Sequence, residues 1–129
     1  MGDLKNFKVR GKIGICFMHY TLQFIRPLDR LEVLKNLNQQ MAEGGGFILL
    51  EKVLSNESLF NRTFIDIFHE YKTNQGYSDT EIQKKREALE NVLIPYRSDE
   101  NITLLKESGF RKIDIFFKWF NWIGIIALK

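Results

Sequence analysis

The chain has 129 residues, of which 44% are hydrophobic and eleven are Phe, so it has the size of one small domain with a buried core. Its 19 basic and 16 acidic residues give a formal net charge of +3. That balance does not favour direct nucleic-acid binding, which requires basic residues clustered on one face. No apolar stretch approaches the roughly 18 residues of a membrane span. The residues after Met1 include no apolar signal region.

Cysteine and histidine are too few for two classes of site. Cys16 is the single cysteine and lies in an apolar run, so it has no internal disulfide partner. One cysteine and two histidines do not build a metal cluster. We therefore expect a cytoplasmic protein with no metal site and no membrane association.

The first predicted unit is a strand, a loop and a helix. An apolar run predicts a strand over residues 13–18, and Pro27 begins an amphipathic helix over residues 27–41. The polar residues His19, Thr21 and Gln23 lie between them. In an open α/β sheet, ligands bind outside the carboxyl ends of the strands, so these three side chains are placed to face a ligand. The alternative is that they only cap and turn the chain.

A second strand is predicted behind the glycine triplet Gly44–Gly46. The triplet ends the helix, and the apolar residues of 47–54 are typical of a strand buried on both faces. A glycine run between a helix and a strand favours a C-cap turn over a phosphate-binding loop, which requires the opposite order. Strand, helix and strand form a βαβ unit with a right-handed crossover.

Three helices are predicted next. The first covers about residues 57–72, with Asn56 as its cap. It carries His69 and Glu70, which are candidates for a chemical role. The more common alternative is a partly buried histidine with a hydrogen-bond partner. Ser78 and Glu81 fit a capping box that opens the second helix, which Pro95 ends. Its inward residues are Ile82, Leu89, Val92 and Leu93, and its exposed residues are Lys84, Lys85, Arg86 and Glu87. The third covers about residues 99–108.

The C-terminal residues predict a β-hairpin. Apolar residues alternate over 113–118, and a second apolar run over 122–128 follows without space for a helix. Two strands this close in sequence pair antiparallel. The expected fold is a single α/β domain over residues 1–129, with the order β-α-β-α-α-α-β-β.

This order resembles the C-terminal half of a Rossmann-like class I methyltransferase fold that depends on S-adenosylmethionine. Several motifs narrow the resemblance to the carboxy-S-adenosyl-L-methionine synthase family over residues 18–129. They are Tyr20-Thr-Leu-Gln-Phe24, Pro27 with Arg30, Glu51-Lys52, Asn74-Gln-Gly-Tyr-Ser78, Gln83-Lys-Lys-Arg86, Ala88-Leu-Glu-Asn-Val92, Ser108-Gly-Phe110 and Phe120-Asn121.

The resemblance implies an enzyme that binds S-adenosylmethionine and prephenate and makes carboxy-S-adenosylmethionine, which a second enzyme uses on the wobble uridine of transfer RNA. It also implies a homodimer. Arg86 would hold the new carboxylate across the dimer, since a guanidinium can pair a carboxylate through two hydrogen bonds. Without the resemblance, Arg86 reads as part of a solvated basic face beside Lys84 and Lys85.

The chain also departs from the family. His19 stands where the family has a cofactor-contacting asparagine, and residues 1–17 do not match the family's sequence. The glycine-rich cofactor loop and the acidic ribose-binding residue that precede the motif in the family have no counterpart here. The sequence therefore leaves two hypotheses: a partial carboxy-S-adenosylmethionine synthase with an incomplete cofactor site, or a non-catalytic remnant that binds a partner through its open sheet edge.

Overall fold

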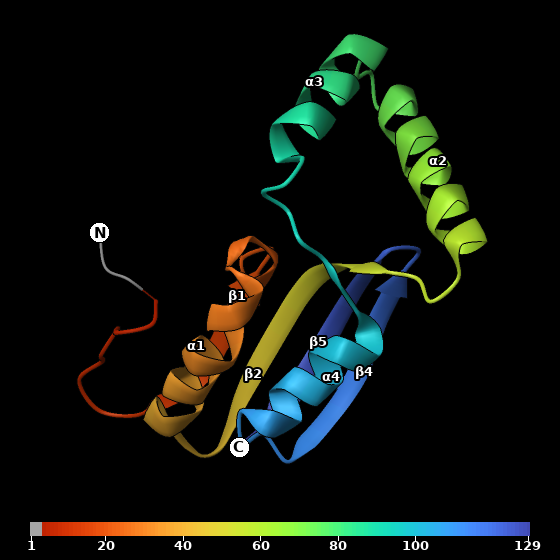
Figure 1. Ribbon diagram of the computed structural model, residues 1–129. Coiled ribbons are helices and arrows are strands. Elements are labelled where there is room, and N and C mark those ends of the chain that lie inside the picture. Colours follow the sequence, from red (N-terminus) through yellow and green to blue (C-terminus); the bar gives the residue numbers. More distant parts are fainter. Residues whose placement is uncertain (1–3) are drawn as a thin grey trace.

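The computed structural model describes residues 4–129 and confirms the expected order of elements (Figure 1). The strands are β1 (Ile13–His19), β2 (Met41–Leu54), β3 (Tyr96–Arg97), β4 (Lys112–Trp119) and β5 (Trp122–Leu128). The helices are α1 (Pro27–Gln40), α2 (Ser58–Asn74), α3 (Asp79–Leu89) and α4 (Ser98–Glu107). Two short elements were not predicted: the 3-10 helix η1 (Leu22–Phe24) and the two-residue strand β3.

The sheet is mixed, with the order β1-β2-β5-β4 and β3 paired to the end of β2. Strands β1 and β2 are parallel and are joined through α1, as a βαβ unit requires. Strand β5 pairs antiparallel with both β2 and β4, so the predicted C-terminal hairpin is confirmed. This arrangement leaves β1 at one edge of the sheet among the described residues.

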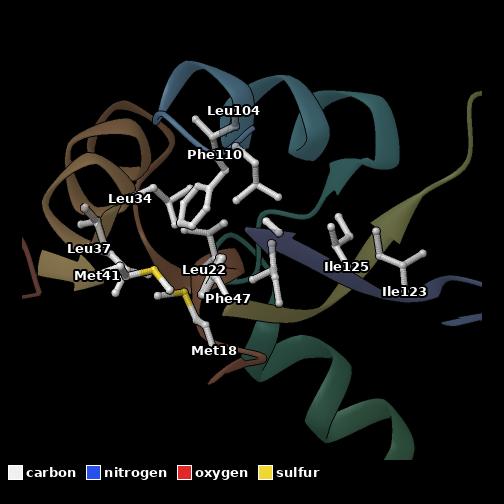
Figure 2. Packing of buried hydrophobic residues seen from close by; sticks show 14 of the residues in the cluster. Met18, Leu22, Leu34, Leu37, Met41, Phe47, Leu104, Phe110, Ile123 and Ile125 are labelled. Atoms are coloured by element: carbon white, nitrogen blue, oxygen red, sulfur yellow. The ribbon is translucent and has the colours of Figure 1, made fainter. Parts of the chain in front are cut away.

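The hydrophobic core lies on one face of the sheet, under α1 and α4 (Figure 2). Alternate side chains of β2 and β5 point into it, among them Phe47, Leu49 and Ile125, which are fully buried. Phe47 stacks on Phe110, which follows α4, with ring centroids 5.4 Å apart. The periodicity of the first predicted helix is confirmed in part, since Leu34 and Leu37 are buried whereas Leu28 is 95% exposed.

The opposite face of the sheet is apolar and exposed. Phe17 on β1, Phe116 on β4 and Ile126 on β5 are among its large exposed side chains. The expectation that the second strand is buried on both faces was wrong, because β2 alternates between buried and half-buried residues along most of its length. Helices α1 and α4 cover the core face of the sheet, whereas these side chains of the other face stay accessible.

The glycine triplet lies inside β2 instead of forming a turn before it, which corrects the predicted boundary. Helix α1 ends at Gln40 and β2 begins at once with Met41. A Cβ on Gly45 would lie 2.8 Å from the carbonyl oxygen of Ala42 and 3.1 Å from that of Ile13. Glycine is therefore required where β1 and β2 approach each other closely, near the irregularity in their register.

Helices α2 and α3 project beyond one end of the sheet (Figure 1). Helix α2 has no fully buried residue, and in α3 only Ile82 is buried. The prediction that Val92 points inward was wrong, because α3 already ends at Leu89 and Val92 is 54% exposed. Helix α2 begins after Glu57 without a side-chain cap, so the expected Asn56 cap was also wrong.

The start of α3 was predicted correctly. Ser78 Oγ accepts a hydrogen bond from the backbone N–H of Glu81, and the Glu81 carboxylate accepts one from the backbone N–H of Ser78. Across the described residues, no helix is long and apolar enough to span a membrane.

Candidate functional site

The segment behind β1 forms a tight turn at the carboxyl end of the parallel strands. His19, the last residue of β1, is exposed, and its carbonyl oxygen accepts a hydrogen bond from Thr21 Oγ1 at 3.0 Å. Tyr20 has a φ of 49°, a left-handed conformation that is uncommon for a residue other than glycine. The His19 and Tyr20 rings are in contact, with centroids 3.9 Å apart and planes tilted by 38°. His19 thus lies where the sequence placed it, at the ligand-binding edge of an α/β sheet.

A buried carboxylate from β2 holds this turn in place. Glu51 is 2% exposed. Its Oε1 accepts hydrogen bonds from the backbone N–H groups of Thr21 (3.2 Å) and Leu22 (2.9 Å), and Oε2 accepts one from Gln23 (3.1 Å). Burial raises the pKa of the carboxyl to about 7, although these three donors and Arg30 lower it. Glu51 therefore caps η1 from another element.

Arg30 secures the same segment from the helix side. Its guanidinium is 1% exposed and donates to three backbone carbonyls: Ile25 at 2.9 Å, Gln23 at 3.2 Å and Ile94 at 2.6 Å. The carbon of the guanidinium lies 4.2 Å from the centroid of the Tyr96 ring. One side chain thus ties the turn that follows β1 to the segment that follows α3.

Gln23 is the third residue of the predicted ligand-facing set, and the structure buries it. Its side chain is 5% exposed, and Oε1 accepts a hydrogen bond from the backbone N–H of Lys52 at 3.0 Å. Thr21 is half-buried and bonds back to His19. For Gln23 and Thr21 the structure favours the alternative, that they cap and turn the chain, whereas the His19 side chain stays accessible.

Aromatic rings line the space between the turn and α2. Trp122, at the start of β5, has its ring centroid 4.7 Å from that of Tyr20 and 5.6 Å from that of Phe68 on α2. Phe68 also packs against Trp119 and Tyr71. The exposed aromatic side of α2 thus meets the end of the sheet through ring contacts.

Cations of β2, α2 and α3 act on one another near this end of the sheet. Lys52 near the end of β2 and Lys72 on α2 are half-buried, and Arg86 in the last turn of α3 is exposed. Burial, and then the like charges of Lys72 and Arg86, lower the pKa of Lys52. Burial, and then the like charge of Lys85, lower the pKa of Lys72. The sequence singled out Arg86 but assigned no site role to Lys52 or Lys72.

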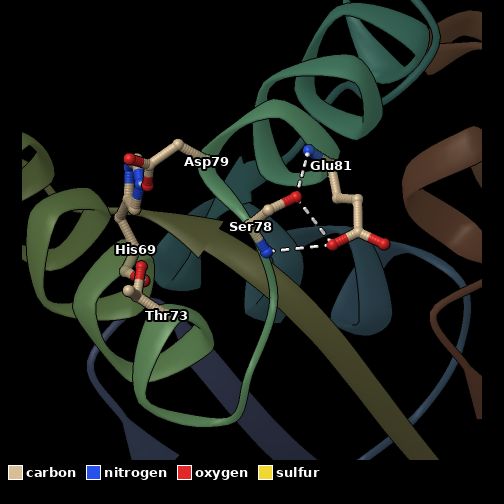
Figure 3. A network of polar contacts seen from close by, with 5 residues as sticks. All are labelled: His69, Thr73, Ser78, Asp79 and Glu81. Carbon is tan, nitrogen blue, oxygen red and sulfur yellow. Dashed lines mark hydrogen bonds and ion pairs between the residues drawn. The ribbon is translucent and has the colours of Figure 1, made fainter.

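His69 and the start of α3 form a separate polar network (Figure 3). His69 Nε2 lies 3.1 Å from Asp79 Oδ1, and both side chains are largely exposed. The predicted hydrogen-bond partner for this histidine exists, and the His69 side chain is 46% exposed. Two exposed partners joined across a helix junction are a surface contact that contributes little to stability.

A cavity lies elsewhere in the structure. It has a volume of about 490 Å³ between the end of β2, the first turns of α2 and α4, and the β4–β5 turn. Neither His19, Lys52 nor Arg86 lines it. No group of three or more metal-ligating side chains occurs among residues 4–129.

The chain is similar in sequence to curated proteins named carboxy-S-adenosyl-L-methionine synthase. It is 46% identical to the one from Methylococcus capsulatus over 127 residues, which are 98% of this chain and 52% of that protein. It is 46% identical to the one from Campylobacter curvus over 129 residues, or 55% of that protein. These alignments include residues 1–17, which the sequence analysis left unmatched. The chain spans about half the length of the curated relatives it matches. No model of a known protein family matches the chain.

Solved structures that share this fold include methyltransferases. The structure of PigF with SAH matches with a TM-score of 0.63 at 18% identity, over 99% of this chain and 34% of that one. Human N-acetylserotonin methyltransferase in complex with SAM matches with a TM-score of 0.65 at 14% identity, over 99% and 32%. The fold class predicted from the sequence, the C-terminal part of a Rossmann-like class I methyltransferase fold ending in an antiparallel hairpin, is therefore confirmed.

Proposed function

We propose that this chain forms the C-terminal part of a carboxy-S-adenosyl-L-methionine synthase, an enzyme that makes carboxy-S-adenosylmethionine from S-adenosylmethionine and prephenate. The observation that carries the proposal is the 46% identity to proteins of that name over 98% of the chain. Solved structures far less similar in sequence support only the fold. The product would serve the modification of transfer RNA wobble uridine in the cytoplasm, with no direct contact between this chain and nucleic acid.

His19 is the residue proposed to contact S-adenosylmethionine. It is exposed at the carboxyl end of β1, where the fold binds ligands, and Glu51 fixes the turn behind it through three backbone donors. These residues fit one side of a cofactor site. When bound, the cofactor supplies the carbon that receives the carboxyl group.

Arg86 is proposed to hold the carboxylate of the product. It lies in the last turn of α3, a helix whose start is fixed by the Ser78–Glu81 capping box, and its guanidinium offers two parallel donors. It is exposed, so it is free to face a ligand. We therefore assign it both the catalytic and the product-binding role proposed for this part of the chain.

The proposal includes a homodimer in which Arg86 reaches the site of the neighbouring copy. Helices α2 and α3 project beyond the sheet, and the α2 side chains of Leu59 and Phe60 are at least half exposed. A projecting helix pair with exposed apolar residues is suited to packing against a second copy.

A second candidate function is a non-catalytic module that binds a partner protein. It is favoured by the accessible edge strand β1 and by the exposed apolar face of the sheet, on which Phe17 is 67% exposed. Such a module would require neither His19 nor Arg86.

Substitution of Arg86 separates the two functions. We would join the 129 residues to the part of the Methylococcus capsulatus relative that they do not cover, and measure affinity for carboxy-S-adenosylmethionine and for S-adenosylmethionine. Arg86→Lys keeps the charge but loses the paired donors, at a cost of about 1.5–3 kcal/mol, or one to two decades in affinity for the carboxylated ligand. S-adenosylmethionine, which lacks the extra carboxylate, should lose less.

The matched control is Lys85→Ala, one residue earlier in α3 and also exposed. It should change neither affinity appreciably. Equal losses for both ligands in Arg86→Lys, or no loss for either, would place Arg86 on a solvated basic surface and remove its proposed role.

A further inference from the structure

The cavity beside the β4–β5 turn is separate from the proposed synthase site, since neither His19 nor Arg86 lines it. Its volume of about 490 Å³ is within the range of small-molecule pockets, roughly 300–1,000 Å³. The Phe120-Asn121 pair, one of the motifs behind the resemblance, lies in the lining. The synthase proposal gives neither residue of this pair a function.

Asn121 contributes a buried acceptor without a donor. The residue is 4% exposed, and its Oδ1 has no hydrogen-bond partner among residues 4–129. Its backbone carbonyl accepts a hydrogen bond from the N–H of Val53 at 2.7 Å, which fixes the residue against the end of β2. Buried polar atoms are nearly always hydrogen-bonded in folded proteins. A donor group on a molecule in the cavity would therefore satisfy Oδ1.

Phenylalanine rings form an apolar part of the lining. The Phe64 ring packs against those of Phe60 and Phe120, with centroids 6.1 and 5.5 Å away. Phe60 is 50% exposed, so part of this aromatic surface remains accessible. A flat ring can stack on such a surface, and the faces of aromatic rings also attract cations.

The charged residues of the lining favour a cationic ligand. Glu57 and Asp99 contribute carboxylates, and Lys118 is the cation among the described residues that line the cavity. No ion pair within residues 4–129 includes Glu57, and that of Asp99 is long, at 3.7 Å. The segment before Glu57 is held in place by Asn61, whose Oδ1 accepts from the backbone N–H of Ser55 at 2.6 Å and whose Nδ2 donates to its carbonyl at 3.1 Å.

We propose that this cavity binds a small aromatic amine, whose ring packs against Phe64 and Phe120 and whose ammonium group donates to Asn121 Oδ1. The ammonium group supplies the donor that Asn121 lacks, and the carboxylates of Glu57 and Asp99 favour its charge. An aromatic acid of the same shape would bring a third negative charge to these two carboxylates. The inference goes beyond the proposed function, because the synthase reaction requires no such ligand.

The experiment measures binding to the 129-residue chain by NMR, following the side-chain amide resonance of Asn121. Phenethylamine is the probe. The comparison compounds are ethylamine, which has no ring, and hydrocinnamate, in which a carboxylate replaces the ammonium group. Phenethylamine should shift the amide resonance in a saturable way and bind at least about tenfold more tightly than either comparison compound.

Asn121→Leu removes the acceptor at similar side-chain size. It should weaken phenethylamine binding about tenfold or more, measured at the backbone N–H of Phe120, because a hydrogen bond to a charged group is lost. Glu57→Gln changes an exposed position, so it keeps the test possible if Asn121→Leu fails to fold, and it should weaken binding about two- to fivefold. Lys118→Gln should strengthen binding, because it removes a like charge.

Glu70→Gln is the matched control, because Glu70 is an exposed carboxylate near the other end of α2 and does not line the cavity. It should change phenethylamine binding by less than about 1.5-fold, as screening of a distant charge predicts. Unchanged binding in both Asn121→Leu and Glu57→Gln would overturn the inference. So would a wild-type chain that binds hydrocinnamate or ethylamine as tightly as phenethylamine, or that binds no phenethylamine.

Discussion

The buried carboxyl of Glu51 makes the stability of this fold dependent on pH in an unusual direction. Its pKa is raised to about 7 in the folded chain, against an ordinary value of 4.5. Between these two pH values the folded chain keeps a proton that the unfolded chain has released. The free energy of unfolding is therefore highest below about pH 4.5 as far as this group is concerned, and it falls as the pH rises toward 7.

The magnitude follows from the size of the shift. Each unit of pKa difference corresponds to about 1.4 kcal/mol, so a rise from pH 5 to pH 8 should lower the free energy of unfolding by roughly 2–3 kcal/mol. Urea denaturation at half-unit pH steps, followed by the fluorescence of the two tryptophans, would measure it.

Glu51→Gln is the variant that isolates this effect. The amide does not titrate, so its free energy of unfolding should change much less over the same pH range. It should also be less stable than the wild-type chain at pH 5, because its NH₂ group faces the N–H of Gln23 where a carboxyl oxygen now accepts. Parallel pH profiles for the wild-type and Glu51→Gln chains would refute this assignment of Glu51.

Three further predictions concern packing, assembly and the cofactor. Gly45→Ala should destabilise the chain by about 1–3 kcal/mol in urea denaturation, because the added Cβ would meet backbone oxygens of neighbouring segments. Gly46→Ala should cost clearly less, since the nearest contact of its Cβ would be a side-chain atom at 3.9 Å. Equal losses of stability in the two variants would contradict this reasoning. The accessible edge of β1 and the apolar sheet face should cause self-association on the order of tens of micromolar, so a well-behaved monomer in sedimentation would count against it. S-adenosylmethionine should bind weakly or not at all to the 129 residues alone, since no glycine-rich turn precedes β1 as the cofactor requires, and micromolar affinity by calorimetry would show that the site lies elsewhere.

The features predicted correctly from the sequence are those that depend on neighbouring residues. The Ser78–Glu81 capping box is complete within four residues, and the C-terminal hairpin follows from two apolar runs with a two-residue connection. Both could be read without knowledge of the rest of the fold.

The features that the sequence did not predict depend on residues far apart in the chain. Glu51 accepts hydrogen bonds from donors 28 to 30 residues earlier, and Arg30 donates to Ile94, 64 residues later. The sequence pattern assigned Gly45 to a turn. Its place in β2 depends instead on the close approach of β1, which the local sequence does not show. Local patterns carry no signal for such contacts, which arise only when the sheet forms.

His19 and Arg86 illustrate the same limit at the candidate site. Their elements could be predicted, and both side chains are exposed. Lys52 was quoted only as part of a motif, because the like charges that act on it, Lys72 and Arg86, come from helices that follow β2 in the chain. The aromatic rings between them are likewise brought together by the fold.

The proposed function is tested most directly by identifying a reaction product. The 129 residues, joined to the part of the Methylococcus capsulatus relative that they do not cover, would be incubated with S-adenosylmethionine and prephenate, and the products separated by mass spectrometry. The account predicts carboxy-S-adenosylmethionine, formed only when both substrates are present and strongly reduced in Arg86→Lys. Absence of that product from a folded chain that binds S-adenosylmethionine, or its undiminished formation by Arg86→Lys, would contradict the account.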